Sequence, residues 1–309
     1  MKNNNIDEYV EDDIDISVLI RALLDGKWVI ASLTGIASVL VVWYSLSLPN
    51  IYTGKALLVA VSAQDSVSSS VQELSGLASL AGISISDSSD TSAVALEKIN
   101  TLSFFEEKIL PQISLPNLFA VKSWDPKSNT IIYDTEIYDA SNNIWVREVE
   151  FPKTPEPSSQ ESHRSFEDHL SVYQDPKTSF ISISIDHQSP FIAKKWADLV
   201  VNEINAYFRE KDRLEANFAV NYLNNEIYNT RLSEVKEVIA AVLAQQIQQL
   251  TLIEANINYV FDYIDPPVVM EKKSSPRRAM ICIIGALLGG FIGSIIALIR
   301  FFKPLRLDK

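Results

Sequence analysis

Cysteine and glycine are scarce in this sequence, and their scarcity excludes several classes of protein. The only cysteine, Cys282, lies inside an apolar run, so no intramolecular disulfide can form. Of nine glycines, the 230 residues from Pro49 to Arg278 hold only Gly54, Gly76 and Gly82. These three cannot form the glycine-rich loops that hold phosphate groups, so P-loop and dinucleotide-binding domains are excluded.

Histidine is also rare, and the sequence holds only His163, His169 and His187. We expect the first two to flank a short helix, and we interpret all three as solvent-exposed side chains rather than metal ligands or catalytic bases. No Ser-His-Asp arrangement stands out, and the carboxylate pairs lie in segments rich in charge. We therefore predict that the protein is not an enzyme and has no catalytic, cofactor-binding or metal site.

Positive charge is in deficit, with 27 Lys and Arg residues against 39 Asp and Glu residues and a net charge of −12. Most of the excess negative charge lies in the long segment from residue 49 to residue 278. An acidic surface of this size repels the phosphates of nucleic acid. The sequence therefore predicts a protein that does not bind nucleic acid.

The hydrophobic residues, 47% of the chain, are concentrated near its two ends. Trp28–Leu48 and Ala279–Ile299 are uncharged runs of 21 residues each. As a helix, each run would be about 31 Å long, which is enough to cross a bilayer. The first run is too long for a signal peptide and its leader is acidic. We therefore predict a membrane protein with two transmembrane helices, which excludes a cytosolic or a secreted enzyme.

Two spans would place both termini on one side of the membrane, and the flanking Lys and Arg residues favour the cytoplasm. The predicted parts are a cytoplasmic head (1–27), transmembrane helix 1 (28–48), a periplasmic α/β domain (49–278), transmembrane helix 2 (279–299) and a cytoplasmic tail (300–309). Because only ten residues follow the second run, we expect no kinase or signalling module there.

Local sequence patterns predict the elements of each part. Apolar periodicity predicts an amphipathic helix on the cytoplasmic surface at residues 14–24, with Asp12, Asp13 or Asp15 as its N-cap. It also predicts helices at 64–82 and at 92–110, and the second of these would end at Pro111. Alternation and β-branched content predict strands at 54–61, 130–134, 144–150, 179–186 and 259–264.

A long helical region fills residues 191–257, which contain neither glycine nor proline. Unbroken, it would be about 100 Å long. It would then carry the chain away from the small membrane-proximal sheet that the strands on either side of it are expected to share. We therefore predict a long protruding helical hairpin that turns where helix propensity is lowest, among Asn221, Asn224, Asn225 and Asn229.

The descending arm of this hairpin is unusually apolar. Residues 238–256 contain a single charge, Glu254, together with several glutamines. Such a helix on a thin stalk needs a partner, and self-association is the simplest way to supply one.

Small residues recur at every fourth position of the second apolar run. Gly285, Gly289 and Gly293 form one stripe, and Ala286, Gly290 and Ser294 form a second stripe beside it. Helices in membranes approach most closely where such residues lie, so these stripes predict a helix-packing face. Its partner would be the first span, another copy of the chain or a different membrane protein.

The segment before this run is stiffened by proline. Pro267 belongs to an extended stretch, and Ser275 is placed to cap a helix that begins at Pro276. Arg277 and its basic neighbours would then lie at the depth of the lipid headgroups. Taken alone, the segment is equally compatible with a simple linker at the membrane boundary.

These features together resemble the Wzz-type chain-length determinants, or polysaccharide co-polymerases. That family has a signature of the form P-x2-P-x4-S-P-K-x11-G-x3-G before and in its second span. Here Pro267, Ser275, Pro276, Arg277, Gly289 and Gly293 fall in register, whereas Met270 and Arg277 replace the second proline and the lysine. Residues 14–28, 44–52, 77–82 and 179–197 also resemble segments of the family.

The resemblance implies a bell- or ring-shaped homo-oligomer in the bacterial inner membrane, with a membrane-proximal α/β base, a protruding helical part and no catalysis. It implies a role in setting the modal length of O-antigen or a related polysaccharide in lipopolysaccharide biosynthesis. The partners would be a Wzy-type polymerase and the growing lipid-linked polysaccharide. The alternatives are a capsule or exopolysaccharide export component, the membrane adaptor of a separate tyrosine autokinase, a sensor, or an enzyme.

Overall fold

The computed structural model describes residues 16–61 and 88–305, and the chain divides into two compact units. One comprises Met1–Pro49 and Ser275–Lys309, and the other comprises Asn50–Ser274. The predicted helix at 64–82 and the candidate caps before residue 16 lie outside the described residues. The two units are described separately.

In its described residues, the first unit contains three helices. α1 (Ile16–Asp25) is the predicted amphipathic helix, α2 (Lys27–Ser47) contains the first apolar run, and α10 (Arg278–Leu305) contains the second. α10 extends past the predicted end of the second run, to Leu305. α2 and α10 pack against one another along their length.

Within the described residues, three helices are long and apolar enough to cross a membrane. They are Lys27–Ser47, Ser233–Ala255 and Arg278–Arg300. The predicted count of two spans is therefore not confirmed, because the descending arm of the hairpin meets the same criteria of length and composition.

The second unit is built on a four-stranded antiparallel sheet in the order β6-β7-β1-β8. The strands are β1 (Tyr52–Ala60), β6 (Leu170–Gln174), β7 (Ile181–His187) and β8 (Phe261–Asp265). The prediction that the strands before and after the long helix share one sheet is confirmed, with β1 lying between them. A bulge between Leu57 and Leu58 shifts the register of β1 against β8.

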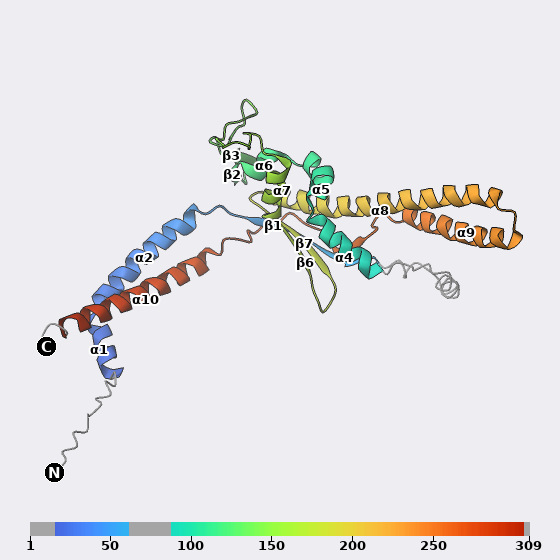
Figure 1. Ribbon diagram of the computed structural model, residues 1–309. Coiled ribbons are helices and arrows are strands. Elements are labelled where there is room, and N and C mark those ends of the chain that lie inside the picture. Colours follow the sequence, from blue (N-terminus) through green and yellow to red (C-terminus); the bar gives the residue numbers. More distant parts are fainter. Residues whose placement is uncertain (1–15, 62–87, 306–309) are drawn as a thin grey trace, which may run out of the picture. The chain divides into compact units, whose positions relative to one another are not determined.

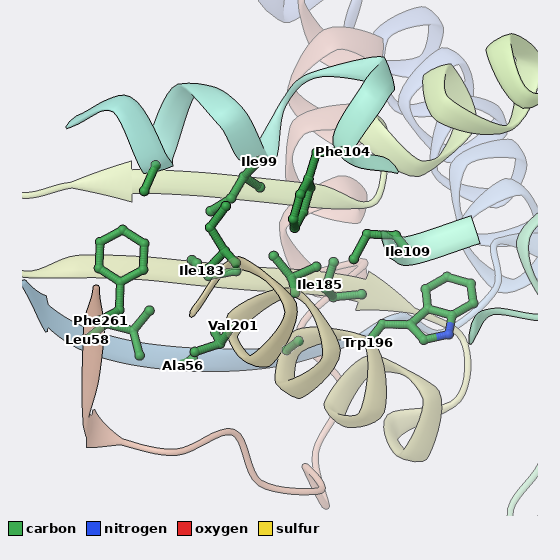
Figure 2. Close-up of a cluster of buried hydrophobic side chains, with 14 of the residues drawn as sticks. Ala56, Leu58, Ile99, Phe104, Ile109, Ile183, Ile185, Trp196, Val201 and Phe261 are labelled. Carbon is green, nitrogen blue, oxygen red and sulfur yellow. The ribbon is translucent and has the colours of Figure 1, made fainter. Parts of the chain in front are cut away.

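One face of this sheet carries the hydrophobic core (Figure 2). Ile181, Ile183 and Ile185 of β7 are fully buried, whereas the serines between them are only half-buried. This alternation is the one predicted for a half-buried strand. The core also contains Trp196 and Val201 of the long helix α8 (Pro190–Asn229), together with side chains from β1, β8 and the short helices.

α8 crosses β1 at an unusually short distance, and this approach depends on Gly54. A Cβ atom at residue 54 would lie 2.7 Å from the Lys194 nitrogen and closer still to the carbonyl group of Ala193. Both contacts are with backbone atoms, which cannot rotate away. Gly54 therefore lets the first turn of α8 lie directly on the sheet.

The predicted helical hairpin consists of α8 and α9 (Ser233–Ala255), which lie side by side (Figure 1). The predicted position of its turn is wrong, because α8 continues through Asn221, Asn224 and Asn225 to Asn229, and the turn occupies residues 230–232. Asparagine opposes a helix by only a few tenths of a kcal/mol per residue. The helix ends where the backbone N–H and the hydroxyl of Thr230 both donate to the Glu226 carbonyl, at 3.0 and 2.9 Å.

The single helix predicted at 92–110 is also wrong. The structure has α4 (Ser88–Ile99), α5 (Leu102–Phe104), a π-helical turn (Phe105–Ile109) and a 3₁₀ turn (Leu110–Gln112). The break falls at Thr101, whose hydroxyl accepts a hydrogen bond from the Phe104 N–H and so starts a new helix.

The remaining elements are short. They are α6 (Leu115–Phe119), α7 (Ser159–Glu167) and two small hairpins, β2 (Val121–Asp125) with β3 (Thr130–Tyr133) and β4 (Tyr138–Asp139) with β5 (Ile144–Trp145). The expected strand at 130–134 is confirmed, and the one at 144–150 is limited to two residues. β2, β4, β6 and α6 were not predicted.

Candidate functional site

The first small-residue stripe of α10 faces α2. Gly285, Gly289 and Gly293 are buried, and the stripe continues at Ala297, which is 3% exposed. A Cβ atom at residue 289 would lie 2.6 Å from the Ala37 Cβ, and one at residue 293 would lie 3.0 Å from the Ile30 Cα. Of the partners considered for this stripe, the structure therefore places the first apolar helix against it.

The second stripe lies at the edge of this contact. Ala286, Gly290 and Ser294 are only half-buried, and the nearest atom to a Cβ at residue 290 would be the Thr34 hydroxyl at 3.5 Å. The Ser294 hydroxyl donates back to the Gly290 carbonyl at 2.8 Å. This edge is therefore the part of the predicted packing face that α2 leaves open.

Replacing Gly289 with leucine should separate α2 from α10. We expect Thr34→Cys and Gly290→Cys, introduced together with Cys282→Ala, to form a disulfide in the membrane on mild oxidation. Adding Gly289→Leu should lower the yield severalfold, because the new side chain cannot fit beside Ala37. Protection of the thiols from maleimide-PEG measures the yield. Leu288→Ala, on the exposed face, is the control, and an equal loss in both variants would contradict the packing described here.

The segment between β8 and α10 is extended and is attached to the residues that lead into β1. It has no helix or strand from residue 266 to residue 274, as the prolines predict. The Ser274 N–H donates to the Ile51 carbonyl at 2.9 Å, and the Lys273 ammonium donates to the Asn50 side chain at 2.9 Å. Pro267 is buried, whereas Met270, at the position of the family's second proline, is 41% exposed.

The predicted capping of α10 by Ser275 is wrong. The helix begins at Arg278 rather than at Pro276, and the first carbonyl to accept helical hydrogen bonds is that of Arg277, from the Met280 and Ile281 N–H groups at 2.9 and 3.2 Å. Ser275 therefore lies too early in the chain to serve as the cap. Arg277 itself is exposed, and its predicted place at headgroup depth stays a prediction.

β8 is held against α8 by one buried polar side chain that the sequence did not single out. Asn205 is 4% exposed. Its side-chain oxygen accepts from the N–H groups of Val260 and Phe261 at 2.8 and 2.9 Å, and its amide donates to the Phe261 carbonyl at 2.9 Å. The clue available in the sequence was a lone asparagine directly after Ile204, on the apolar face of the helix.

The interpretation of the histidines as solvent-exposed is wrong, because His163 and His169 are half-buried and His187 is only 3% exposed. Its Nδ1 accepts from the Ser189 N–H at 2.8 Å, so the proton must be on Nε2, which donates to the Asn117 carbonyl at 2.9 Å. Burial lowers the pKa of this ring to about 4. His163 lies inside α7 rather than before it, and within the described residues no three His, Cys, Asp or Glu side chains could together hold a metal ion.

Acid should destabilise the second unit through His187. The ring takes up a proton near pH 6.5 when the chain is unfolded but only near pH 4 when it is folded, so stability is lost as the pH falls between these values. The loss is at most about 1.4 kcal/mol per pH unit. Urea unfolding of wild type and His187→Gln at pH 7, 5.5 and 4.5 measures it. The variant should show the shallower dependence on pH, and equal slopes would contradict this assignment.

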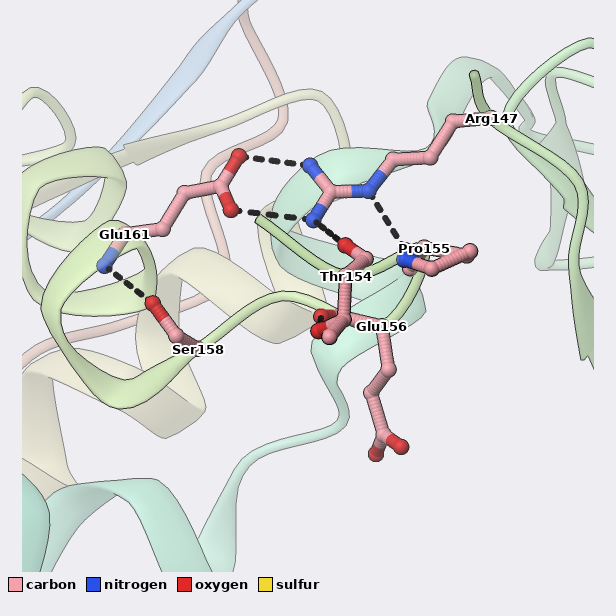
Figure 3. A network of polar contacts seen from close by, with 6 residues as sticks. All are labelled: Arg147, Thr154, Pro155, Glu156, Ser158 and Glu161. Atoms are coloured by element: carbon pink, nitrogen blue, oxygen red, sulfur yellow. Dashed lines mark hydrogen bonds and ion pairs between the residues drawn. The ribbon is translucent and has the colours of Figure 1, made fainter. Parts of the chain in front are cut away.

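A charged network secures the proline-containing loop before α7 (Figure 3). The Arg147 guanidinium donates to both carboxylate oxygens of Glu161, at 2.5 and 2.9 Å, and to the carbonyls of Thr154 and Pro155. The hydrogen bond from Arg147 lowers the pKa of Glu161. Ser158 caps α7 by accepting from the Glu161 N–H at 3.3 Å. All of these groups bind one another, so the network has a structural role.

The two arms of the hairpin expose different chemistry. α9 exposes aliphatic side chains at Val235, Val238 and Ile247. The outer half of α8 exposes Phe218, Tyr222 and Tyr228, with asparagines between them. Such surfaces on a thin pair of helices are unusual for a side that faces only water.

A family model of known proteins matches the first third of the chain. Residues 12–99 match the model described as Wzz, chain length determinant protein. The predicted resemblance is confirmed on this match.

Two of the solved structures to which this chain is similar are polysaccharide co-polymerases. A full-length bacterial polysaccharide co-polymerase is 14% identical, with 94% of this chain and 98% of that chain covered and a TM-score of 0.40. A fragment of the polysaccharide co-polymerase WzzB from Salmonella Typhimurium is 14% identical, with 73% and 100% covered and a TM-score of 0.32. Among curated protein sequences, none matches the chain.

The matched segment, residues 12–99, contributes to both units. It contains α1 and α2 of the first unit, and β1 and α4 of the second. The signature residues from Pro267 to Gly293 lie beyond it, as do the hairpin and three of the four strands of the sheet. Their roles therefore stay predictions.

Proposed function

We propose that this protein regulates the modal chain length of O-antigen or a related surface polysaccharide, as a non-catalytic oligomeric scaffold that acts with a Wzy-type polymerase. The match of residues 12–99 to the chain length determinant family carries this proposal. The helix pair and the long hairpin support it, because they offer a membrane anchor and an extended surface rather than an enclosed reaction site.

We place the protein in the bacterial inner membrane with α2 and α10 as its two spans, both termini in the cytoplasm and the central domain in the periplasm. α9 has the composition of a third span, but it packs on α8. A membrane that enclosed α9 would also have to enclose the charges of α8 beside it, including Arg213, whose guanidinium lies 3.8 Å from the Glu254 carboxylate. Burying such charges in lipid is costly, which favours the two-span arrangement.

Single cysteines at the two ends of α9 test this topology. In a Cys282→Ala background, Asn229→Cys precedes α9 and Asn256→Cys follows it, and both positions are exposed. If α9 stays in the periplasm, a membrane-impermeant maleimide should label both in cells whose outer membrane has been permeabilised. Labelling of only one would show that α9 crosses the membrane.

The apolar face of α9 would supply contacts between copies in a ring- or bell-shaped oligomer. Val238 is 64% exposed on this arm, and residues 238–253 contain no charge. We expect Val238→Glu to reduce the higher bands after amine cross-linking in membranes. Glu237→Gln, its polar neighbour, is the control and should leave them unchanged.

Deleting the gene tests the function itself. We expect surface polysaccharide from the deletion strain to lose its modal length and to run on a gel as a ladder weighted to short chains. A plasmid-borne copy should restore the mode, and Val238→Glu should restore it less well. An unchanged ladder in the deletion strain would overturn the proposal, and loss of all surface polysaccharide would favour an export component.

A further inference from the structure

On its outer half, α8 exposes a face on which charges are replaced by amide and aromatic side chains. Its exposed residues are Leu214, Glu215, Asn217, Phe218, Asn221, Tyr222, Asn224, Asn225, Tyr228 and Asn229. From residue 216 to residue 225 the helix has no charged side chain. The same helix up to Arg213 is rich in charge, with pairs such as Lys194–Asp198 and Glu210–Arg213. The change in chemistry therefore follows position along the helix.

The polar and aromatic groups of this face are unoccupied in the part of the chain that the structure describes. None of its five asparagine side chains makes a hydrogen bond there. Phe218, Tyr222 and Tyr228 are 76%, 60% and 85% exposed, and none of them contacts another ring of the described residues. The face therefore presents hydrogen-bond donors, acceptors and flat apolar surfaces together, and none of them has a partner among residues 16–61 and 88–305.

Local folding does not account for these residues. Asparagine is one of the less favourable residues in a helix interior, and aromatic side chains also lose rotamer freedom there. A solvated helix face is better served by Glu, Lys or Gln. The concentration of asparagine and tyrosine on one side of α8 therefore indicates a surface that recognises a ligand.

The chemistry of the face fits a carbohydrate better than a second helix. An amide side chain both donates and accepts, which matches the hydroxyl groups of a sugar. An aromatic ring offers a flat apolar surface to the C–H face of a sugar ring, and tyrosine adds a hydroxyl at its edge. A second copy of the chain would pack better against the aliphatic face of α9, because contacts between copies are mostly apolar at their centre.

We propose that this face of α8 binds the growing polysaccharide, and that the bound glycan is extended and carries no net charge. The inference rests on the proposed function, because that function supplies the polysaccharide. The face runs for about 22 Å from residue 214 to residue 229, so it would contact several sugar units in succession. Because the face has few charges, it selects for neutral over acidic glycans.

Binding by the purified full-length protein in detergent tests this directly. The probe is the neutral surface polysaccharide of the host strain, released by mild acid and labelled at its reducing end, and its fluorescence anisotropy is followed. We expect Phe218→Ala with Tyr228→Ala to weaken binding at least tenfold. Asn221→Asp with Asn225→Asp should also weaken it, because the shape is kept while charge is added.

A matched control removes two exposed aromatic side chains that lie outside α8. Phe151→Ala with Tyr173→Ala, at residues 96% and 60% exposed, should bind as wild type does. Circular dichroism should show equal helix content in all variants. Polygalacturonate, an acidic polysaccharide, should compete poorly for the wild-type protein.

Three outcomes would overturn the inference. They are the absence of binding by wild type, equal binding by wild type and the Phe218/Tyr228 variant, and a loss of cross-linked oligomer in that variant with binding unchanged. The last would assign the face to contacts between copies. The proposed function fails separately, through an unchanged ladder in the deletion strain, so the two failures can be distinguished.

Discussion

Replacing Gly54 with valine is expected to lower the free energy of unfolding of the second unit by about 3 kcal/mol or more. A side chain at residue 54 would enter the backbone of Ala193 and Lys194, so either β1 or the first turn of α8 must move. Either movement opens the core between Leu58 and Trp196. Pulse proteolysis of the full-length protein in urea measures the loss. Alanine at the same position should have a smaller effect in the same direction.

Gly35 provides the matched control for this prediction. A Cβ atom at residue 35 would have no atom within 4 Å, so Gly35→Val should leave the unfolding midpoint close to that of wild type. If Gly54→Val unfolds at the same urea concentration as Gly35→Val, the close contact between α8 and β1 is not present in solution.

Replacing Asn205 with alanine is expected to lower the free energy of unfolding by about 3 kcal/mol, because three backbone groups at the start of β8, those of Val260 and Phe261, lose their buried partner. The effect should be concentrated at the edge of the sheet. Amide hydrogen exchange at Val260 and Phe261 should therefore accelerate more than exchange at the residues of β7. Leucine, which has nearly the same shape, should not rescue stability, because the loss is in hydrogen bonding rather than in packing.

Asn217→Ala is the control on the same helix. Asn217 is exposed and makes no hydrogen bond in the described part of the chain, so its replacement should change stability by no more than about 0.5 kcal/mol. Equal effects at residues 205 and 217 would show that Asn205 does not hold β8.

The features that the sequence predicted correctly depend on short-range patterns. The alternation of Ile181, Ile183 and Ile185 identified a strand with one buried face, and two uncharged runs identified α2 and α10. The small-residue stripe was recognised from its spacing alone. In each case, residues within a few turns or strand positions of one another carry the whole signal.

The features that the sequence missed depend on contacts between distant residues. Asn205 and His187 are polar side chains whose partners lie 55 and 70 residues away, at Val260 and Asn117. No local pattern reveals such a partner. Gly54 did offer a local sign, since a lone glycine inside a strand marks a close backbone approach, but which element approaches is decided by the whole fold.

Two of the misplaced helix boundaries lie at threonines. Propensity disfavoured helix at the asparagines of α8, which nevertheless continues to Asn229, and apolar periodicity favoured helix through Thr101, where a capping hydrogen bond to the Phe104 N–H starts a new helix. A capping bond is worth about 1 kcal/mol, which exceeds the difference in propensity between most pairs of residues.

The strand order also has a consequence for the synthesis of the protein on the ribosome. β1 is the first strand to be made, yet its two neighbours in the sheet are β7 and β8, which end at His187 and Asp265. At about 5–20 residues per second, roughly 10–40 s separate the synthesis of β1 from that of β8. During this time both edges of this apolar strand are unpaired. The domain therefore folds only when its chain is almost complete, and a stall in translation before residue 265 would leave an exposed strand prone to aggregation.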